Sequence, residues 1–255
     1  MAVALCRLES LRTLVSGEVS ARLSFMAWTV CIPTLKRYDL LVRLCLSLNS
    51  ERCRDLNLRI CILDNGGGLL DSSLWCTSQA QFVFARPEVI VPKYNLGVAG
   101  SWNFFLQHFG ACIIANDDVV FAEETIDSFA SASMAFPEVV IFEGKDPVAG
   151  FSTFYVNKPD TWLEMGGFDE LLNPAYFEDN DCRHRLCLVG NPVKKILLKG
   201  WRHDNSSTLS SADESYRRMH WCLYRRNRSY YIRKWGGLPG REKNISPFGK
   251  IFPEG

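Results

Sequence analysis

The sequence predicts an α/β fold in which helices cover both faces of a largely parallel sheet. Short apolar runs of strand length alternate with segments of helical periodicity along the first half of the chain. The runs are almost continuously apolar, which is typical of parallel strands buried on both faces. Polar residues follow directly after two of these runs, at the position where such sheets bind ligands.

Four strands and three helices are expected in the first half of the chain. The expected strands cover residues 28–33, 59–64, 89–91 and 111–115. Leucines recur at helical spacing over residues 40–48, and further helices are expected over 99–109 and 123–134. Pro33 and the segment Asn65-Gly66-Gly67-Gly68 end the first two strands.

The second half is less regular. Strands are expected over 139–142, 151–156 and 194–198, and helices over 159–165, 179–188 and 211–235. Gly166-Gly167 and Gly190 end the first two of these helices, and Ser211-Ala-Asp-Glu214 has the pattern of a capping box that opens the third. No repeat and no clear linker divides the chain.

The composition is that of an ordinary globular protein. The chain has 255 residues, of which 47% are hydrophobic and 22% charged, so it can bury a sizeable core without disulfides or metals. Its net charge of +1 argues against a dedicated nucleic-acid binder. Its ten cysteines form no C-x-x-C pair and several lie in apolar runs, which predicts free thiols in a reducing compartment. No apolar run is long enough to predict a membrane-spanning helix.

Two strand ends carry candidate site residues. Asn116-Asp117-Asp118 follows the fourth strand, and two adjacent carboxylates suit a cation such as Mg²⁺ or Mn²⁺ bound together with substrate phosphates. A solvated turn or a helix cap is the alternative interpretation. Asp64 ends the second strand, where a carboxylate can bind a nucleobase or ribose, or can simply stabilise the glycine-rich turn that follows.

Three further segments are candidates. Asn95-Leu-Gly97-Val-Ala-Gly100 precedes a helix that contains Asn103, and a helix amino terminus favours phosphate. Glu178, Asp179 and Asp181 form an acidic cluster that either supplies a general base or caps a helix. His203 is either structural or, if it lies near Asp118, a second metal ligand.

The last helix is basic and aromatic. A solvated face over an aromatic core, a diphosphate clamp and a contact with an anionic membrane surface all remain open as interpretations. Its basic residues are Arg217, Arg218, Arg225, Arg226, Arg228, Arg233 and Lys234.

Taken in order, these features resemble a family 2 glycosyltransferase over about residues 28–235. Val30-Cys-Ile-Pro-Thr34 and Leu63-Asp64-Asn65-Gly66 are similar to the ends of the family's first two strands. Asn95-Leu-Gly97-Val-Ala-Gly100-Ser-Trp-Asn103 is similar to its helix start, and Asn116-Asp117-Asp118 stands at its Asp-x-Asp motif. Met165-Gly-Gly167-Phe-Asp169-Glu170, followed by Tyr176-Phe177-Glu178-Asp179-x-Asp181, is similar to its acceptor-side signature.

The resemblance implies a GT-A fold, with a Rossmann-like nucleotide-binding half and a mixed central sheet. It implies that Asp118 and His203 hold Mn²⁺ or Mg²⁺ at the donor diphosphate, although which of Asp117 and Asp118 is the main ligand stays open. Asp179 would be the general base and Glu178 would help to bind the acceptor. The implied donor-binding residues are Thr34, Arg37, Asp64, Asn95, Gly97, Asn103 and Asp117.

The implied reaction is inverting transfer of a sugar from a nucleotide-diphosphate donor to a hydroxyl of a glycan or related acceptor, as in polysaccharide biosynthesis. UDP is the favoured nucleotide, with GDP and dTDP open. The expected organisation is an extension at 1–25 and one domain at 26–255, with a nucleotide-sugar-binding half (about 26–120), an acceptor-binding half (about 121–210) and a basic helix and tail (about 211–255). A cytoplasmic protein is expected, soluble or peripheral to a membrane through the basic helix.

Two other functions remain as alternatives. A sugar-1-phosphate nucleotidyltransferase would need a glycine-rich, arginine-containing loop after the first strand, and Pro33-Thr-Leu-Lys-Arg37 contains no glycine. A non-catalytic nucleotide- or carbohydrate-binding module of the same fold is the other alternative, and the intact acidic clusters argue against it.

Overall fold

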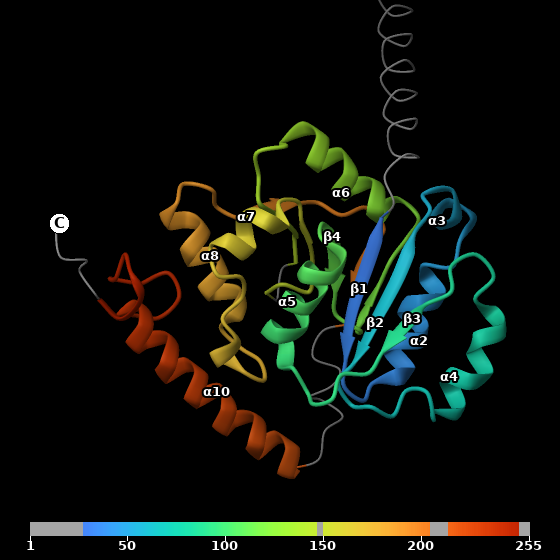
Figure 1. Cartoon of the computed structure of the whole chain (residues 1–255), viewed down its shortest axis with the longest axis horizontal. Coiled ribbons are helices and arrows are strands. Elements are labelled where there is room, and N and C mark those ends of the chain that lie inside the picture. Colours follow the sequence, from blue (N-terminus) through green and yellow to red (C-terminus); the bar gives the residue numbers. More distant parts are fainter. Residues whose placement is uncertain (1–27, 147–149, 205–213, 250–255) are drawn as a thin grey trace, which may run out of the picture.

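A seven-stranded sheet forms the centre of the protein in a computed structural model that describes residues 28–146, 150–204 and 214–249 (Figure 1). The expected extension at 1–25 lies outside the described residues. A small second sheet pairs β5 (Val119–Val120) with β9 (Arg202–His203). In spatial order the large sheet consists of β3 (Glu88–Ile90), β2 (Arg59–Asp64), β1 (Thr29–Thr34), β4 (Cys112–Ala115), β7 (Thr153–Val156), β6 (Ile141–Gly144) and β8 (Lys194–Ile196).

The predicted α/β class is confirmed, and the sheet is mixed. β1 runs parallel to β2 and β4, and β2 runs parallel to β3. β7 is antiparallel to both of its neighbours, β4 and β6. Ala115 pairs with Thr153, so the carboxyl end of β4 lies beside the amino end of β7. This pairing brings two segments that are distant in sequence to one edge of the sheet.

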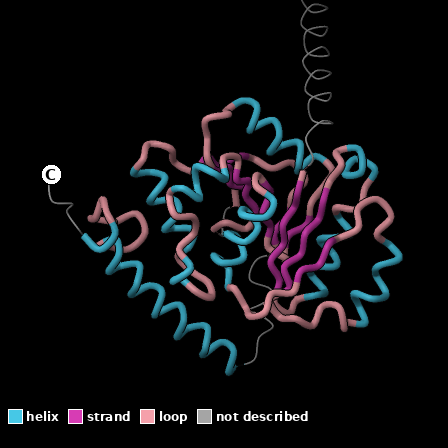
Figure 2. The backbone as a smooth tube through the Cα atoms, viewed as in Figure 1, coloured by secondary structure: helices cyan, strands magenta, loops and turns pink. Residues whose placement is uncertain are grey.

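Helices cover both faces of the sheet (Figures 1 and 2). The bounds of the helices agree with the predictions to within two or three residues where both are described. The predictions contain no counterpart of the short helices α3 (Glu51–Asp55) and α4 (Ser73–Ser78) or of the β5–β9 pair. None of the described helices is long and apolar enough to span a membrane. The helices are α2 (Tyr38–Ser47), α3 (Glu51–Asp55), α4 (Ser73–Ser78), α5 (Gly97–Phe109), α6 (Glu124–Ala135), α7 (Pro159–Glu164), α8 (Glu178–Leu188) and α10 (Glu214–Trp235), with 3-10 turns η1 (Gln79–Gln81), η2 (Glu170–Leu172) and η3 (Pro247–Gly249).

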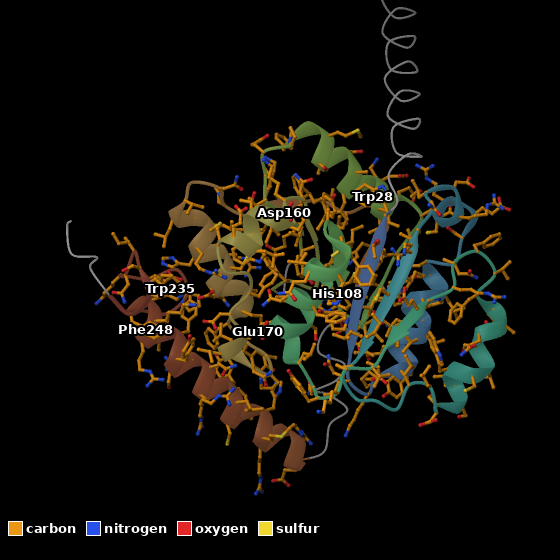
Figure 3. The ribbon with its side chains drawn as sticks, viewed as in Figure 1. Trp28, His108, Asp160, Glu170, Trp235 and Phe248 are labelled. Carbon is orange, nitrogen blue, oxygen red and sulfur yellow. The ribbon has the colours of Figure 1, made fainter. Side chains whose placement is uncertain are left out.

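Alternation along the strands divides the core into two apolar clusters. Val30 and Ile32 of β1 belong to the cluster that contains Trp75 of α4, whereas Cys31 between them belongs to the cluster that contains Trp102 of α5. Successive side chains of a strand point to opposite faces, so the two clusters lie on opposite sides of the sheet. Side chains fill the space between the sheet and the surrounding helices (Figure 3). The two clusters fix the positions of the strand ends.

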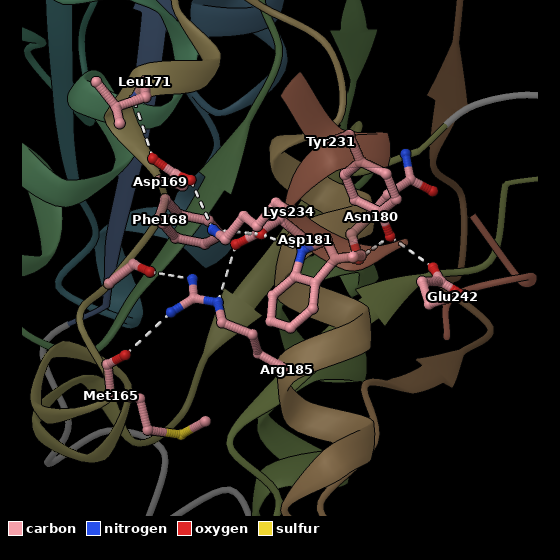
Figure 4. A network of polar contacts seen from close by, with 12 residues as sticks. Met165, Phe168, Asp169, Leu171, Asn180, Asp181, Arg185, Tyr231, Lys234 and Glu242 are labelled. Atoms are coloured by element: carbon pink, nitrogen blue, oxygen red, sulfur yellow. Dashed lines mark hydrogen bonds and ion pairs between the residues drawn. The ribbon is translucent and has the colours of Figure 1, made fainter. Parts of the chain in front are cut away.

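A buried ionic network attaches α10 to the rest of the molecule (Figure 4). Lys234 Nζ lies 2.6 Å from Asp169 Oδ2 and 2.7 Å from Asp181 Oδ1, and the side chain of Asp181 is completely buried. Trp235 Nε1 donates to Asp181 Oδ1, and Arg185 pairs with the other carboxylate oxygen. Burial alone would raise the pKa of Asp169, but hydrogen bonding and charge from Lys234 outweigh it and lower that pKa.

We expect Lys234→Ala to destabilise the protein by about 3–5 kcal/mol, because it leaves the buried carboxylate of Asp181 without its ammonium partner. Arg233→Ala removes an exposed positive charge from the neighbouring position and is the matched control. Urea unfolding followed by circular dichroism measures both. Equal unfolding free energies for the two variants would contradict a structural role for the network.

Candidate active site

Three polar side chains gather where β1 and β4 end. Thr34 is the last residue of β1, and its Oγ1 donates a 2.7 Å hydrogen bond to Asp117 Oδ2. Removal from bulk water raises the pKa of Asp117 to about 7; the Thr34 hydroxyl opposes this effect and the charge of Asp118 adds to it. The adjacent carboxylates therefore repel each other in a partly desolvated place, and a cation would favour the ionised form of both.

His203 joins Asp118 to a third carboxylate. The β5–β9 pair aligns Val119 with His203, and His203 Nε2 lies 3.2 Å from Asp118 Oδ1. On the other side of the ring, Nδ1 lies 2.6 Å from Asp146 Oδ2. Burial would lower the pKa of His203, but the two carboxylates outweigh it and raise that pKa. His203 thus lies beside Asp118, which is the condition for the metal interpretation of this histidine.

These residues fit a divalent metal as a partial site. Asp118 Oδ1 is buried and has the His203 imidazole as its neighbour, and a carboxylate oxygen and an imidazole nitrogen are both ligands for Mn²⁺. Asp146 orients the imidazole as outer carboxylates orient metal-binding histidines. Within the described ranges, no group of three or more His, Cys, Asp or Glu side chains could hold an ion. An ion held by Asp118 and His203 would therefore need further oxygen ligands, such as substrate phosphates.

Asp146 is a site residue that sequence reasoning missed. It lies two residues after β6, which ends at Gly144. β6 is antiparallel to β7, as β4 is, so β6 and β4 end at the same edge of the sheet. The position of Asp146 just after a strand could have marked it as a candidate. Its place beside His203, however, depends on the order of the strands in the sheet, which the sequence does not reveal.

Asp64 is fully buried, and its oxygens are already hydrogen bonded within the chain. Oδ1 accepts from the Gly66 N–H at 3.0 Å and Oδ2 accepts from the Leu69 N–H at 2.8 Å. The hydroxyl of Tyr38 donates to Oδ1 at 3.1 Å. Asp64 thus stabilises the glycine-rich loop after β2 by accepting its backbone N–H groups, as one of the two interpretations of this residue predicts.

Arg37 directly precedes α2, and its guanidinium pairs with the Asp39 carboxylate at 2.8 Å.

Asn95, Gly97 and Asn103 lie at or near the start of α5, beside the segment at 168–174. Asn95 Oδ1 accepts from the Gly97 N–H, and a Cβ on Gly97 would lie 2.6 Å from Asn173 Nδ2. Asn103 Nδ2 donates to the Phe168 carbonyl and to Glu170 Oε1, while its Oδ1 accepts from the Phe168 N–H. Gly97 and Asn103 are therefore engaged in contacts between α5 and the segment at 168–174, while Asn95 caps the start of α5 through the Gly97 N–H.

A cavity of about 630 Å³ opens beside the carboxylates. Asn116 and Ser152 belong to its wall, and the Asn116 N–H donates to the Ser152 carbonyl, so the wall includes the residue that directly precedes Asp117. Five of its fifteen lining residues are aromatic, and two carry carboxylates. The lining residues are Val98, Trp102, Asn116, Gly150, Phe151, Ser152, Ala175, Tyr176, Phe177, Glu178, Asp179, Asn180, Tyr224, Leu238 and Pro239.

The two carboxylates at the start of α8 differ in their surroundings. Asp179 Oδ2 lies 2.6 Å from Arg183 NH1, and Arg183 also pairs with the buried Glu143. Glu178 Oε2 is buried with no hydrogen-bond partner, and burial together with the charge of Asp179 raises the pKa of Glu178 well above its usual value. A Cβ on Gly150 would lie 2.1 Å from Asp179 Oδ2, so glycine is needed there to leave room for the carboxylate.

Comparison with known proteins identifies the fold. No protein-family model matches the sequence, and no curated protein sequence matches it. Among solved structures, the mannosyltransferase PcManGT from Pyrobaculum calidifontis, in complex with GDP-Man and Mn²⁺, is similar with a TM-score of 0.55 and 15% identity, over 94% of this chain and 76% of that chain.

TarS of S. aureus is similar as well. The TarS 1–349 structure matches with a TM-score of 0.50 and 15% identity, over 69% of this chain and 58% of that chain. Its complex with UDP-GlcNAc matches with a TM-score of 0.51 and 14% identity, over 78% of this chain and 65% of that chain. The chain thus spans less than two thirds of these TarS chains. It has the GT-A-like α/β fold of glycosyltransferases.

Proposed function

We propose that the protein is a metal-dependent, inverting glycosyltransferase that moves a sugar from a nucleoside-diphosphate donor to a hydroxyl of a glycan or related acceptor. The observation that carries the proposal is the pairing of Asp118 with His203 just after β4, where Asn116, two residues before Asp118, lines a cavity that Glu178 and Asp179 also line. Similarity to structures that hold GDP-Man with Mn²⁺ or UDP-GlcNAc supports a nucleotide-sugar donor. UDP remains the favoured nucleotide in this proposal.

The donor would lie along the ends of β1, β2 and β4. We assign Asp118 and His203 to Mn²⁺ or Mg²⁺, because Asp118, not Asp117, faces the histidine. Asp117, held by Thr34, would bind the ribose or the sugar, and Arg37 would lie near the nucleotide. Asp64, Asn95, Gly97 and Asn103 would act indirectly, by fixing the loops on either side.

The chemistry that a bound divalent ion supplies at such a site is neutralisation of charge on the departing diphosphate. Asp179 would accept the proton of the acceptor hydroxyl as its oxygen attacks the anomeric carbon, and a single displacement inverts the configuration. Arg183 orients the Asp179 carboxylate. Glu178, whose raised pKa favours the neutral acid, would hydrogen bond to the acceptor without competing as a base.

Two further properties belong to the proposal. The nucleotide-sugar-binding half would extend to about residue 120 and the acceptor-binding half from there to about 210, with the site at their junction. All cysteines in the described ranges are free thiols, most of them buried, which supports a reducing compartment such as the cytoplasm.

We also propose that α10 contacts an anionic membrane surface. Its exposed face carries Arg217, Arg225, Arg228 and Arg233, and none of these forms an ion pair with another described residue. Trp221 lies on the same helix with 60% of its surface exposed. Arginines next to an exposed indole suit the headgroup region of a negatively charged bilayer.

For the donor site, we expect a nucleoside diphosphate with Mn²⁺ to raise the melting temperature. At about 100 times Kd the stabilisation is about 2.7 kcal/mol, or about 5–10 °C for a chain of this size. UDP, GDP, dTDP and CDP are tested with and without Mn²⁺. Asp118→Asn should abolish the shift, whereas Asp160→Asn, an exposed change in α7, should retain it. The assignment fails if both variants respond equally.

For the general base, we expect Asp179→Asn to lower the transfer rate by about 10²–10⁴-fold while the Mn²⁺-nucleotide shift persists. The amide cannot take the acceptor proton, but it leaves the donor site intact. Product formation is followed by mass spectrometry with the stabilising nucleotide's sugars, and Asp160→Asn is again the control. Transfer at the wild-type rate by Asp179→Asn would remove this residue from the mechanism.

For the membrane contact, we expect co-sedimentation with phosphatidylcholine vesicles that contain phosphatidylglycerol and none with pure phosphatidylcholine. The double variant Arg225→Gln, Arg228→Gln should bind about 30-fold more weakly, since each arginine contributes about 1 kcal/mol near such a surface. Arg54→Gln, Arg59→Gln removes the same charge from α3 and β2 and should bind normally. Equal loss in both double variants would indicate nonspecific charge attraction.

A further inference from the structure

We infer that the cavity beside Asp179 takes an uncharged sugar ring, so that the acceptor is a neutral glycosyl group and not a phosphorylated or otherwise anionic one. The inference rests on the proposed function, because that function makes this cavity the acceptor site. Three independent features of the lining carry it: its rings, its charge and its unsatisfied polar atoms.

Aromatic rings form two parts of the cavity wall. Tyr224 of α10 lies 5.4 Å from Tyr176 and 5.4 Å from Phe177, measured between ring centroids, so the three rings are contiguous. Phe151 and Trp102 form another ring pair with centroids 5.9 Å apart. Ring faces provide apolar area to which the C–H face of a sugar can pack.

The charge of the lining disfavours an anion. The described residues that line the cavity include Glu178 and Asp179 and no lysine or arginine. The guanidinium of Arg183, which contacts two lining residues, is engaged with Asp179 and Glu143 and stacks 4.6 Å above the Phe151 ring. A phosphate in the cavity would face the Asp179 carboxylate with no cation of its own, and such like-charge contacts cost several kcal/mol.

Two buried polar atoms of lining residues have no hydrogen-bond partner. Glu178 Oε2 is an available acceptor or, in the neutral acid, a donor, and Trp102 Nε1 is a donor. Buried polar groups without partners are costly, so a ligand gains affinity if a small shift of these lining side chains lets it satisfy them. A sugar hydroxyl both donates and accepts hydrogen bonds, and a sugar ring carries several hydroxyls. Such a ring can pair with both Glu178 Oε2 and Trp102 Nε1, whereas an ionised phosphate can only accept.

The same geometry makes Tyr224 a specificity-determining residue. It belongs to α10, whereas its ring partners Tyr176 and Phe177 precede α8, so it completes the wall from a distant part of the chain. Tyr176 is linked to α10 a second time, through a 3.3 Å contact between its hydroxyl and His220 Nδ1. Removing the Tyr224 ring should therefore weaken sugar binding and leave the donor site unaffected.

Saturation-transfer NMR tests this inference without requiring turnover. The probes are methyl glucoside, methyl mannoside and methyl N-acetylglucosaminide, each compared with the phosphate ester of the same sugar. We expect at least one glycoside to receive saturation on its ring protons and the phosphate esters to receive none. Tyr224→Ala should weaken glycoside binding about tenfold, whereas Tyr224→Phe and Cys222→Ala, an exposed change on the same helix, should bind as the wild type does.

Binding of the phosphate esters as tight as that of the glycosides would overturn the inference, and so would failure of every glycoside to bind. Undiminished binding by Tyr224→Ala would overturn the role of the tyrosine. The Mn²⁺-nucleotide melting shift of Tyr224→Ala shows whether the variant is folded, and Tyr176→Ala is the second variant if it is not. Absence of that shift in the wild type would refute the proposed function. Glycoside binding is measured without a donor, so its failure is distinguishable from the failure of the proposed function.

Discussion

The antiparallel pairing of β7 with β4 is the constraint on which the candidate site depends. Because Ala115 pairs with Thr153, the segment that carries Asp117 and Asp118 lies beside Ser152, and the hydrogen bond from the Asn116 N–H to the Ser152 carbonyl extends the contact beyond the strands. A parallel strand at this position would instead begin at the opposite edge of the sheet. The reversal therefore brings the residues assigned to the donor next to the cavity assigned to the acceptor, and a bound sugar and its acceptor can meet there.

Buried polar groups then fix the loops around this edge. Asp64 holds the loop after β2, Asn103 holds the turn at Phe168, and Asp181 with Lys234 holds α10 against α8. None of these side chains faces the cavity, yet each joins two segments that contribute to the site. A buried ion pair of this kind is weak evidence for net stability, because desolvation offsets much of the attraction. Its consequence here is positional: α10 is held where Tyr224 completes the aromatic wall.

The sequence predicted most of the sheet and helices, because buried strands and amphipathic helices follow local periodicity. It also predicted that Asp118 and His203 form one site if they are close, and they lie 3.2 Å apart. It did not find Asp146, whose role depends on the order of β4, β7 and β6. Nor could it decide between the two interpretations of Asp64, because the hydroxyl of Tyr38 and the loop that surround this carboxylate come together only in the folded chain. The donor and base assignments stay predictions that biochemistry must test.

The most direct test of the central claim is a nucleotide-sugar consumption assay with product identification. The purified protein is incubated with Mn²⁺, UDP- and GDP-linked sugars and a panel of neutral glycosides, and mass spectrometry measures nucleoside diphosphate and glycosylated product together. We predict equimolar formation of nucleoside diphosphate and glycosylated product from one nucleotide class, and loss of both in Asp118→Asn. Release of pyrophosphate from a nucleoside triphosphate and a sugar phosphate, or no consumption of any donor by protein that is folded and binds glycosides, would contradict it.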